Sequence, residues 1–189
     1  MLYAFEREFL PLLQRAWRNP RLHFQLDADH PLGASQHQKI VVIDDAIAFV
    51  GGLDLTLSRW DTRRHAARDP RRKDAGNRPY PPFHDVQIAV DGEAAAALGE
   101  LARERWQRAT GRTLTAPAPD GDVWPPALTP DLTDATLAIA RTDPGWNGRP
   151  EVREVEALFV RAIAAAERSL YIENQYFTSH RIGDALIER

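Results

Sequence analysis

The chain has 189 residues, of which 43% are hydrophobic and 27% charged, so it can form one domain with a real core or two small lobes. Its formal net charge of −3 argues against a dedicated nucleic-acid binder, which is normally clearly basic. There is no Cys, which excludes disulfides and thiolate metal sites, and the six His are scattered without metal-ligand spacing. We therefore expect no metal site and no cofactor.

The sequence shows neither a signal peptide nor a membrane span. The opening stretch MLYAFEREFL is interrupted by Glu6, Arg7 and Glu8 and lacks the apolar segment of a signal peptide. No run approaches the roughly 20 apolar residues that a transmembrane helix needs. We expect a cytoplasmic protein, or one that contacts a membrane only peripherally.

The N-terminal region is predicted to hold one helix and one strand. Apolar residues recur at helical spacing over 2–17, where Pro11 should kink or restart the helix. Apolar and polar residues alternate over 21–26, which predicts a strand. The loop that follows, 27–36, contains His30. We expect His30 to be an ordinary loop residue, and the alternative is that it contacts the substrate.

Two short apolar runs, 40–43 and 46–50, are separated only by Asp44 and Asp45. This pattern predicts a β-hairpin with an acidic turn. At the turn, Asp44 is expected to make local hydrogen bonds rather than take part in chemistry. The glycine pair 51–52 leaves the backbone open to close approach by a ligand or another segment.

His37 and Lys39 precede and begin the first of these strands. Because side chains alternate along a strand, they should stand on one face, roughly 6 to 7 Å apart. Such a pair alone is most simply two polar residues on a strand. The full spacing, His-x-Lys-x4-Asp-x6-Gly-Gly, is much rarer by chance.

The segment 60–82 is polar and holds seven basic residues against three acidic ones. The basic residues are Arg63, Arg64, Arg68, Arg71, Arg72, Lys73 and Arg78. A solvated, mobile loop is the simplest interpretation. The alternative is a basic flap near an anionic phosphate or lipid surface, with Trp60 and the segment 80–83 supplying apolar contacts.

The rest of the chain alternates strands and helices. Strands are expected over 85–90, 135–141 and 170–176, and helices over 93–108, over 151–168 and from 181 onward. Gly and Pro concentrate over 111–131, which predicts a connector between two halves.

Three strings together resemble the phospholipase D superfamily, the HKD-motif phosphodiesterases. They are the spaced motif with its continuation GGLDLTLSRWD, YPPFHDV at 80–86, and YIENQYFTS at 171–179. The continuation is similar to the lipid-cleaving branch. The resemblance implies an α/β fold, a mixed β-sheet with helices packed on it.

The resemblance also implies two similar lobes, each of which gives one motif to a shared site. On this basis 1–110 is a first lobe without its opening strand and helix, 111–131 is the connector, and 132–189 is the start of a second lobe. Only one His-x-Lys is present, so we expect a fragment of a longer enzyme or a truncated gene product. The sequence leaves the oligomeric state open.

The resemblance assigns chemistry to four residues. His37 resembles the nucleophile that forms a phosphohistidine, and Lys39 would neutralise the non-bridging phosphate oxygens. Asp54 stands where many relatives carry Asn and would hold Lys39 or the phosphate-binding cluster. Asp85 would orient His37, although it could instead cap the start of a strand. His84 should face the other way and is not expected to be catalytic.

The remaining candidate residues are structural or bind substrate. Motif residues with a structural role are Asp44, Gly51 and Gly52, and candidate substrate contacts are His30, Trp60, Asn174 and Gln175. Asn174 and Gln175 interrupt an apolar run, which suggests a polar cleft between the lobes.

The resemblance implies hydrolysis or transfer of the phosphatidyl group of a phosphatidylcholine-like phospholipid, with peripheral membrane contact and no nucleic acid. Because the acid His of a second motif is absent, we expect this chain alone to have little or no activity. Two alternatives stay open. One is another phosphodiesterase of the superfamily, either a nuclease or cardiolipin synthase-like, and the other is a non-catalytic remnant that binds phosphate or membrane.

Overall fold

The computed structural model describes residues 19–118, 121 and 123–189, and the helix expected over 2–17 lies outside them. Two compact units are present. One comprises the described residues up to Asp29 together with Ser35–Pro130, and the other comprises His30–Ala34 and Asp131–Arg189. The assignment of these segments to lobes of a phospholipase D-like fold stays a prediction.

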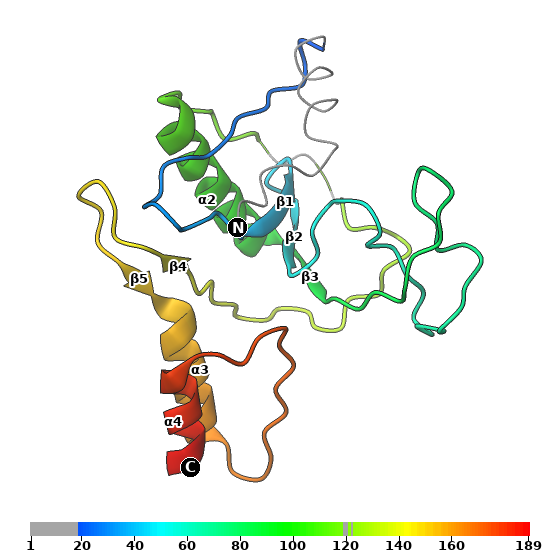
Figure 1. The fold of residues 1–189 in the computed structure, drawn as a ribbon. Coiled ribbons are helices and arrows are strands. Elements are labelled where there is room, and N and C mark those ends of the chain that lie inside the picture. Colours follow the sequence, from blue (N-terminus) through cyan, green and yellow to red (C-terminus); the bar gives the residue numbers. More distant parts are fainter. Residues whose placement is uncertain (1–18, 119–120, 122) are drawn as a thin grey trace. The chain divides into compact units, whose positions relative to one another are not determined.

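The first unit contains a three-stranded antiparallel sheet in the order β1-β2-β3 (Figure 1). Its strands are β1 (Lys39–Ile43), β2 (Ile47–Gly51) and β3 (Gln87–Asp91). The predicted hairpin is therefore confirmed, and the expected strand 85–90 is confirmed with slightly later bounds. Asp44 and Asp45 have φ values of 53° and 54°, the positive values that a type I′ turn requires at its central residues.

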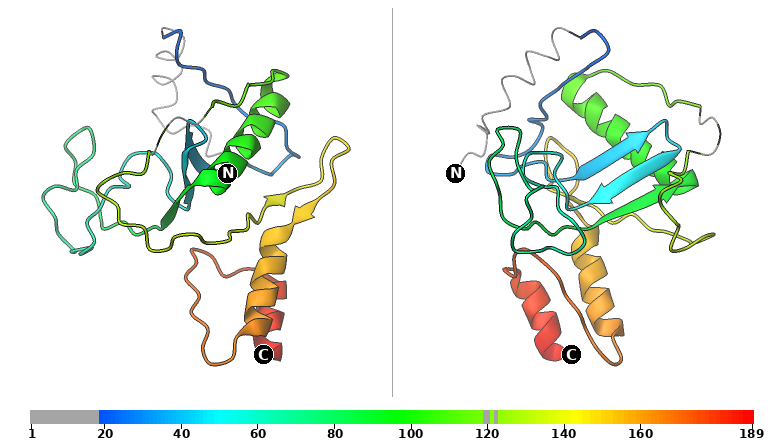
Figure 2. Two further views of the ribbon diagram at one scale, coloured as in Figure 1. Left: turned by 180° about the vertical axis from the view of Figure 1, so that it is seen from behind. Right: turned by 90° about the vertical axis from the view of Figure 1, so that its right-hand side faces the viewer.

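Helix α2 (Gly92–Thr110) covers one face of this sheet (Figure 2). A small core forms where its Ala95 and Leu98 meet Ala48 of β2. Partly buried side chains pack around this core, namely Ile40, Val42, Val50 and Val90. Because the even-numbered residues of β1 face α2, alternation turns Lys39 toward the opposite face of the sheet.

A buried ion pair fastens the hairpin turn to α2. Arg103 Nη1 lies 2.8 Å from Asp45 Oδ2, and the two side chains are 14% and 7% exposed. A Cβ on Gly99 would overlap Asp45 Oδ1, so the helix needs glycine where the turn approaches it. The hydrogen bond from Arg103 to Asp45 raises the pKa of Arg103, which therefore stays charged.

The long connection from β2 to β3 is irregular, as expected for 60–82, but it is organised around a second buried ion pair. Arg72 is 1% exposed, and its Nη1 lies 2.9 Å from Oδ1 of Asp61. The Asp61 carboxylate also accepts hydrogen bonds from the N–H groups of Thr62 and Phe83 and contacts His65. Burial raises the pKa of Asp61, but these hydrogen bonds outweigh it and hold the pKa well below its usual range.

The second unit contains a short antiparallel strand pair and two helices. The strands are β4 (Thr142–Asp143) and β5 (Val152–Arg153), and the helices are α3 (Glu154–Ala165) and α4 (His180–Glu188). The two helices pack together, and both expected helices are confirmed, α3 with shorter bounds. Ser179 caps α4 by accepting a hydrogen bond from the Ile182 N–H.

Three predicted strands, 21–26, 135–141 and 170–176, are wrong, because these segments are irregular. Their alternation is real, but an isolated strand is not stable without hydrogen-bonded neighbours. Among the described residues no sheet accepts them, and Tyr171 is 87% exposed. The fold is the expected mixture of helices and strands, with the correction that every strand pairing described is antiparallel rather than mixed.

Candidate functional site

Lys39 begins β1 on the face of the sheet away from α2, and its ammonium group lies in a cluster of polar groups. Nζ is 3.1 Å from Asp54 Oδ1 and donates a hydrogen bond of 2.9 Å to the backbone carbonyl oxygen of His37. The side chain of Lys39 is only 13% exposed, whereas the His37 residue is exposed. The structure thus brings Lys39 and Asp54 into contact, next to the backbone of the exposed residue His37. Their catalytic roles stay predictions.

Arg59 adds a second cation to this cluster, and sequence reasoning missed it. Its Nη2 lies 3.8 Å from Asp54 Oδ2, and its guanidinium carbon lies 5.0 Å from the centre of the Phe83 ring. Two cations around one carboxylate leave a net charge of about +1, which suits the single negative charge of a phosphodiester. The sequence did hold a sign of this second cation, since Arg59 lies inside the string GGLDLTLSRWD that carries the resemblance.

The glycine pair allows the start of β3 to approach the end of β2. A Cβ on Gly51 would overlap the Val86 carbonyl oxygen, and a Cβ on Gly52 would overlap Asp85 Oδ1. The Gly52 N–H donates a hydrogen bond of 3.1 Å to the same Val86 oxygen. The open backbone expected at these positions therefore serves a close contact between two segments of this chain.

The strand register places His37 and Asp85 at the same end of the sheet. Gly51 of β2 pairs with Lys39 on one side and with Gln87 on the other, so β1 and β3 run in the same direction. His37 lies two residues before Lys39, and Asp85 lies two residues before Gln87. The strands that follow them are separated by two strand spacings, roughly 10 Å between Lys39 and Gln87.

The Asp85 carboxylate is not bonded to the His37 ring. Its Oδ1 accepts a hydrogen bond of 2.8 Å from the Val86 N–H, as expected for a residue that caps a strand. Both residues are described, and no hydrogen bond joins them, so the orienting role of Asp85 stays a prediction.

His84 takes part in a separate polar chain. Its Nδ1 lies 3.4 Å from Nε2 of His65, and the two rings meet edge to face with centres 5.1 Å apart. His65 in turn places its Nδ1 3.2 Å from Asp61 Oδ2.

The remaining candidate residues make other contacts. Trp60 is 51% exposed, and Arg71 lies over its ring at 5.6 Å. His30 belongs to the second unit, where its Nδ1 lies 3.0 Å from the Pro31 carbonyl oxygen. Asn174 and Gln175 also belong to the second unit. Asn174 accepts a hydrogen bond from the Tyr176 N–H, in an irregular segment rather than a strand.

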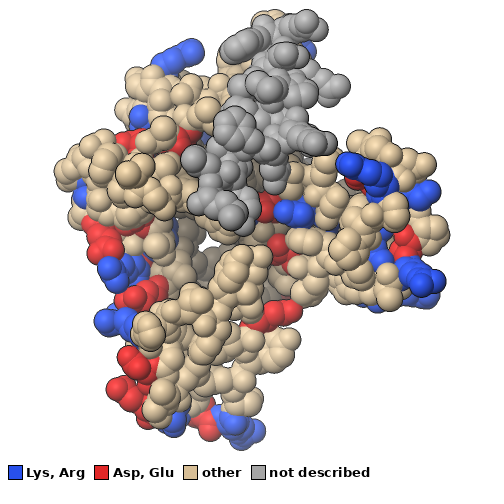
Figure 3. Space-filling view, viewed as in Figure 1, with Lys and Arg blue, Asp and Glu red and all other residues tan. Residues whose placement is uncertain are grey.

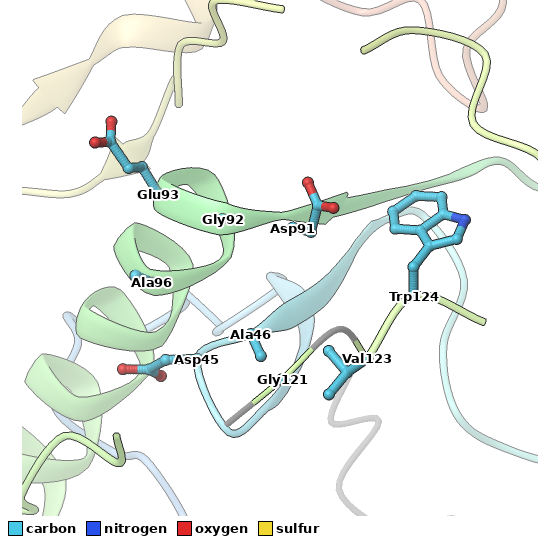
Figure 4. A pocket seen from close by; sticks show the side chains of 9 residues that line it. All are labelled: Asp45, Ala46, Asp91, Gly92, Glu93, Ala96, Gly121, Val123 and Trp124. Atoms are coloured by element: carbon cyan, nitrogen blue, oxygen red, sulfur yellow. The ribbon is translucent and has the colours of Figure 1, made fainter. Parts of the chain in front are cut away.

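A cavity of about 390 Å³ in the first unit does not coincide with these residues (Figure 4). The charged residues lining it, Asp45, Asp91 and Glu93, are all acidic. Such a wall repels a phosphate group. The cluster around Lys39 differs from this wall because it contains two cations, and the nearby residue His37 is open to solvent.

The described residues contain neither a cluster of metal-binding side chains nor a helix that could span a membrane. No group of three or more His, Asp or Glu within 19–118, 121 and 123–189 could hold a metal ion. In the same part of the chain, every helix is too short or too polar to cross a membrane.

Comparison with known proteins gives a consistent set of relatives, although no family model matches. In an alignment of 222 positions, gaps included, the chain is 29% identical to Phospholipase D1 of Schizosaccharomyces pombe. The alignment covers 88% of this chain and 16% of that protein. It is 29% identical over 216 residues to Phospholipase D1 of Saccharomyces cerevisiae, covering 82% and 12%. Cardiolipin synthase A of Yersinia pseudotuberculosis is 28% identical over 144 residues, covering 75% and 25%. The chain thus spans a quarter or less of each of these relatives.

Proposed function

We propose that this chain, whose sequence is similar to phospholipases D and to a cardiolipin synthase over most of its length, supplies the nucleophile half of a phosphodiesterase site for glycerophospholipids. One observation carries the proposal. His37 is an exposed residue two positions before Lys39, whose ammonium group lies 3.1 Å from Asp54, and Arg59 lies 3.8 Å from the same carboxylate. This is a nucleophile next to a positively charged site for phosphate.

The proposed reaction has two displacements at phosphorus. A ring nitrogen of His37 attacks the phosphorus atom, the bond from phosphorus to the head-group oxygen breaks, and the phosphatidyl group stays on the imidazole. Lys39 and Arg59 stabilise the charge that grows on the non-bridging oxygens. Water or another alcohol then attacks the phosphorus and frees His37, which gives hydrolysis or transfer.

The leaving alcohol must receive a proton as its bond to phosphorus breaks. The reaction therefore needs a general acid in addition to the nucleophile His37. A general acid of this kind contributes typically 10²–10⁴-fold. We assign that role to a second His-x-Lys motif, because the 189 residues hold only one such motif. A substrate whose leaving group needs no proton would bypass the requirement.

This difference gives a direct test. A phosphodiester of p-nitrophenol has a weakly basic leaving group, so attack by His37 can proceed without the acid. We expect a burst of p-nitrophenolate of about one equivalent per chain, followed by slow turnover. The adduct should map to His37 by mass spectrometry under alkaline conditions, which preserve phosphohistidine.

Two variants make the result specific. His37→Ala should abolish both the burst and the adduct. His180→Ala, which removes an exposed imidazole at the start of α4, should change neither. A burst that survives His37→Ala, or an adduct on another residue, would exclude the proposed nucleophile.

A second candidate, cardiolipin synthase-like transfer, is favoured by the similarity to the Yersinia protein. In that case the phosphatidyl group on His37 would pass to a lipid alcohol rather than to water. Adding phosphatidylglycerol or buffer to the isolated adduct separates the two candidates. Faster decay with the lipid alcohol, and a new phosphodiester product, would favour transfer.

A further inference from the structure

The basic residues of the loop 60–82 fall into two groups that the sequence does not distinguish. Three are neutralised by carboxylates of the same loop. These pairs are Arg71 with Asp69 at 2.7 Å, Arg72 with Asp61 at 2.9 Å, and Arg78 with Asp74 at 2.7 Å. All three acidic residues of the loop are therefore used internally.

The other four basic residues are exposed and have no ion pair within the described part of the chain. They are Arg63, Arg64, Arg68 and Lys73. Figure 3 shows basic side chains gathered over this loop, on the right of the molecule in that view. A chain of net charge −3 thus carries a local surface of uncompensated positive charge.

The loop that carries these four cations has its own internal scaffold. Arg72 donates hydrogen bonds through Nη2 to the backbone carbonyl oxygens of Ala66 and Ala67. These residues lie between Arg64 and Arg68, so the buried guanidinium fixes the backbone that bears the exposed cations. The backbone of the loop is therefore already ordered in the free protein, so docking loses less conformational entropy than it would for a disordered loop.

Apolar side chains are exposed on the same loop and next to it. Trp60 is 51% exposed and Leu55 is 79% exposed, and Leu57 lies between them in sequence. Trp prefers the boundary between water and lipid, where its ring is buried and its N–H stays hydrated. A loop that combines exposed apolar side chains with arginines outside any ion pair of the described residues suits a membrane interface better than nucleic acid. Proteins bind the phosphate backbone of nucleic acid mainly through charge and do not need exposed apolar side chains for it.

We propose that the loop from Leu55 to Lys73 docks on the surface of an anionic lipid bilayer. Arg63, Arg64, Arg68 and Lys73 contact lipid phosphates and carboxylates, and Trp60 and the exposed leucines enter the head-group region. The inference rests on the proposed function, because the loop leaves the sheet after Gly51, the residue paired with Lys39, and returns to it at Gln87. Docking would present the cluster of Lys39 and Asp54 to lipid.

Vesicle co-sedimentation of the whole chain tests this. Binding should be strong to phosphatidylcholine vesicles that contain phosphatidylserine and weak to phosphatidylcholine alone. Each basic side chain near an anionic surface contributes about fivefold in affinity. We therefore expect the triple variant Arg63→Gln, Arg64→Gln, Arg68→Gln to lose roughly 100-fold in binding, and added salt to weaken the wild-type protein in the same direction.

A matched variant removes three arginines outside the loop, Arg112, Arg161 and Arg168, again by change to Gln. It alters the net charge equally and should bind as the wild type does. Equal losses in the two triple variants would overturn the proposal, as would equal binding to the two vesicle types. Tighter binding to duplex DNA than to the phosphatidylserine vesicles would also overturn it.

Trp60 provides a readout that does not depend on charge. Vesicles should shift the tryptophan emission of the wild-type protein to shorter wavelength, and Trp60→Phe should lose most of that shift. An unchanged shift in Trp60→Phe would contradict insertion of this loop. Circular dichroism of each variant separates a lost contact from a lost fold.

The His37→Ala protein distinguishes failure of this inference from failure of the proposed function. It should bind phosphatidylserine vesicles as the wild type does, while giving no burst with the p-nitrophenyl substrate. A wild-type protein that gives the burst but does not bind vesicles would overturn the docking inference alone.

Discussion

The ammonium group of Lys39 is held in the structure by two oxygen atoms, so the position of this positive charge is set before any ligand binds. Asp54 and the backbone carbonyl of His37 hold Nζ at 3.1 and 2.9 Å. A positive charge held in place before the reaction stabilises a transition state without reorganisation when charge develops.

We predict that Lys39→Met lowers the burst rate with the p-nitrophenyl substrate by roughly 10²–10³, the cost of losing one preorganised donor at a charged oxygen. The chain has only one other lysine, Lys73, so Lys73→Met is a natural control. Stopped-flow absorbance should show an unchanged burst for this exposed lysine. A similar loss in both variants would indicate a general effect of charge.

The spacing of the sequence predicts this part of the site well, because alternation along a strand is a local property. Ile40 and Val42 pack on α2, and Lys39 faces the other side. Arg59 could not be predicted in the same way. Its contacts with Asp54 and Phe83 depend on the course of an irregular loop, for which side-chain periodicity gives no information.

At the scale of elements, the hairpin and the helices were predictable because each is stabilised mainly by near neighbours. The hairpin is closed by a turn of two aspartates, and α2 packs directly on the strands that precede it. The segments 21–26, 135–141 and 170–176 have equally clear alternation. They stay irregular because a strand also requires a partner, and the local sequence does not specify one.

The loop from β2 to β3 should loosen in acid, because its central carboxylate is held in the charged form. The pKa of Asp61 lies well below the usual range of an aspartate, and the pKa of Asp69 is lowered to about 2 by its hydrogen bonds with Arg71. A depressed pKa means that the charged form stabilises the folded loop. This stabilisation is fully present above about pH 4 and is lost as the pH falls through the folded-state values.

Amide hydrogen exchange, corrected for its intrinsic pH dependence, measures this. We predict that protection of the Thr62 and Phe83 N–H groups, which donate to Asp61, is high at neutral pH and declines below about pH 4. Asp61→Asn should lower the protection at neutral pH and flatten its dependence on pH. Asp131→Asn, an exposed acid outside the loop, should behave as the wild type.

At the scale of the whole molecule, the proposed mechanism assigns only one of its two His-x-Lys motifs to this chain. With an alcohol leaving group, the proposed reaction requires an acid besides His37. We predict that the 189-residue chain turns over phosphatidylcholine in vesicles little or not at all, even where it gives a burst with the p-nitrophenyl substrate. Choline release measures this, with a complete two-motif enzyme as reference, and turnover near that of the reference would contradict the prediction.

The hydrogen bond from Gly52 to Val86 has a consequence for how such a protein can diversify. It closes the base of the long loop, so both loop ends are fixed at the sheet whatever lies between them. Lengthening a closed loop is cheap, since each doubling costs only about 0.6 kcal/mol. Insertions or replacements between Arg59 and His84 could therefore change the surface that the protein recognises while leaving His37, Lys39 and Asp54 in place. The three-stranded sheet would then be the constant part of the site, and the loop between β2 and β3 would be the variable part.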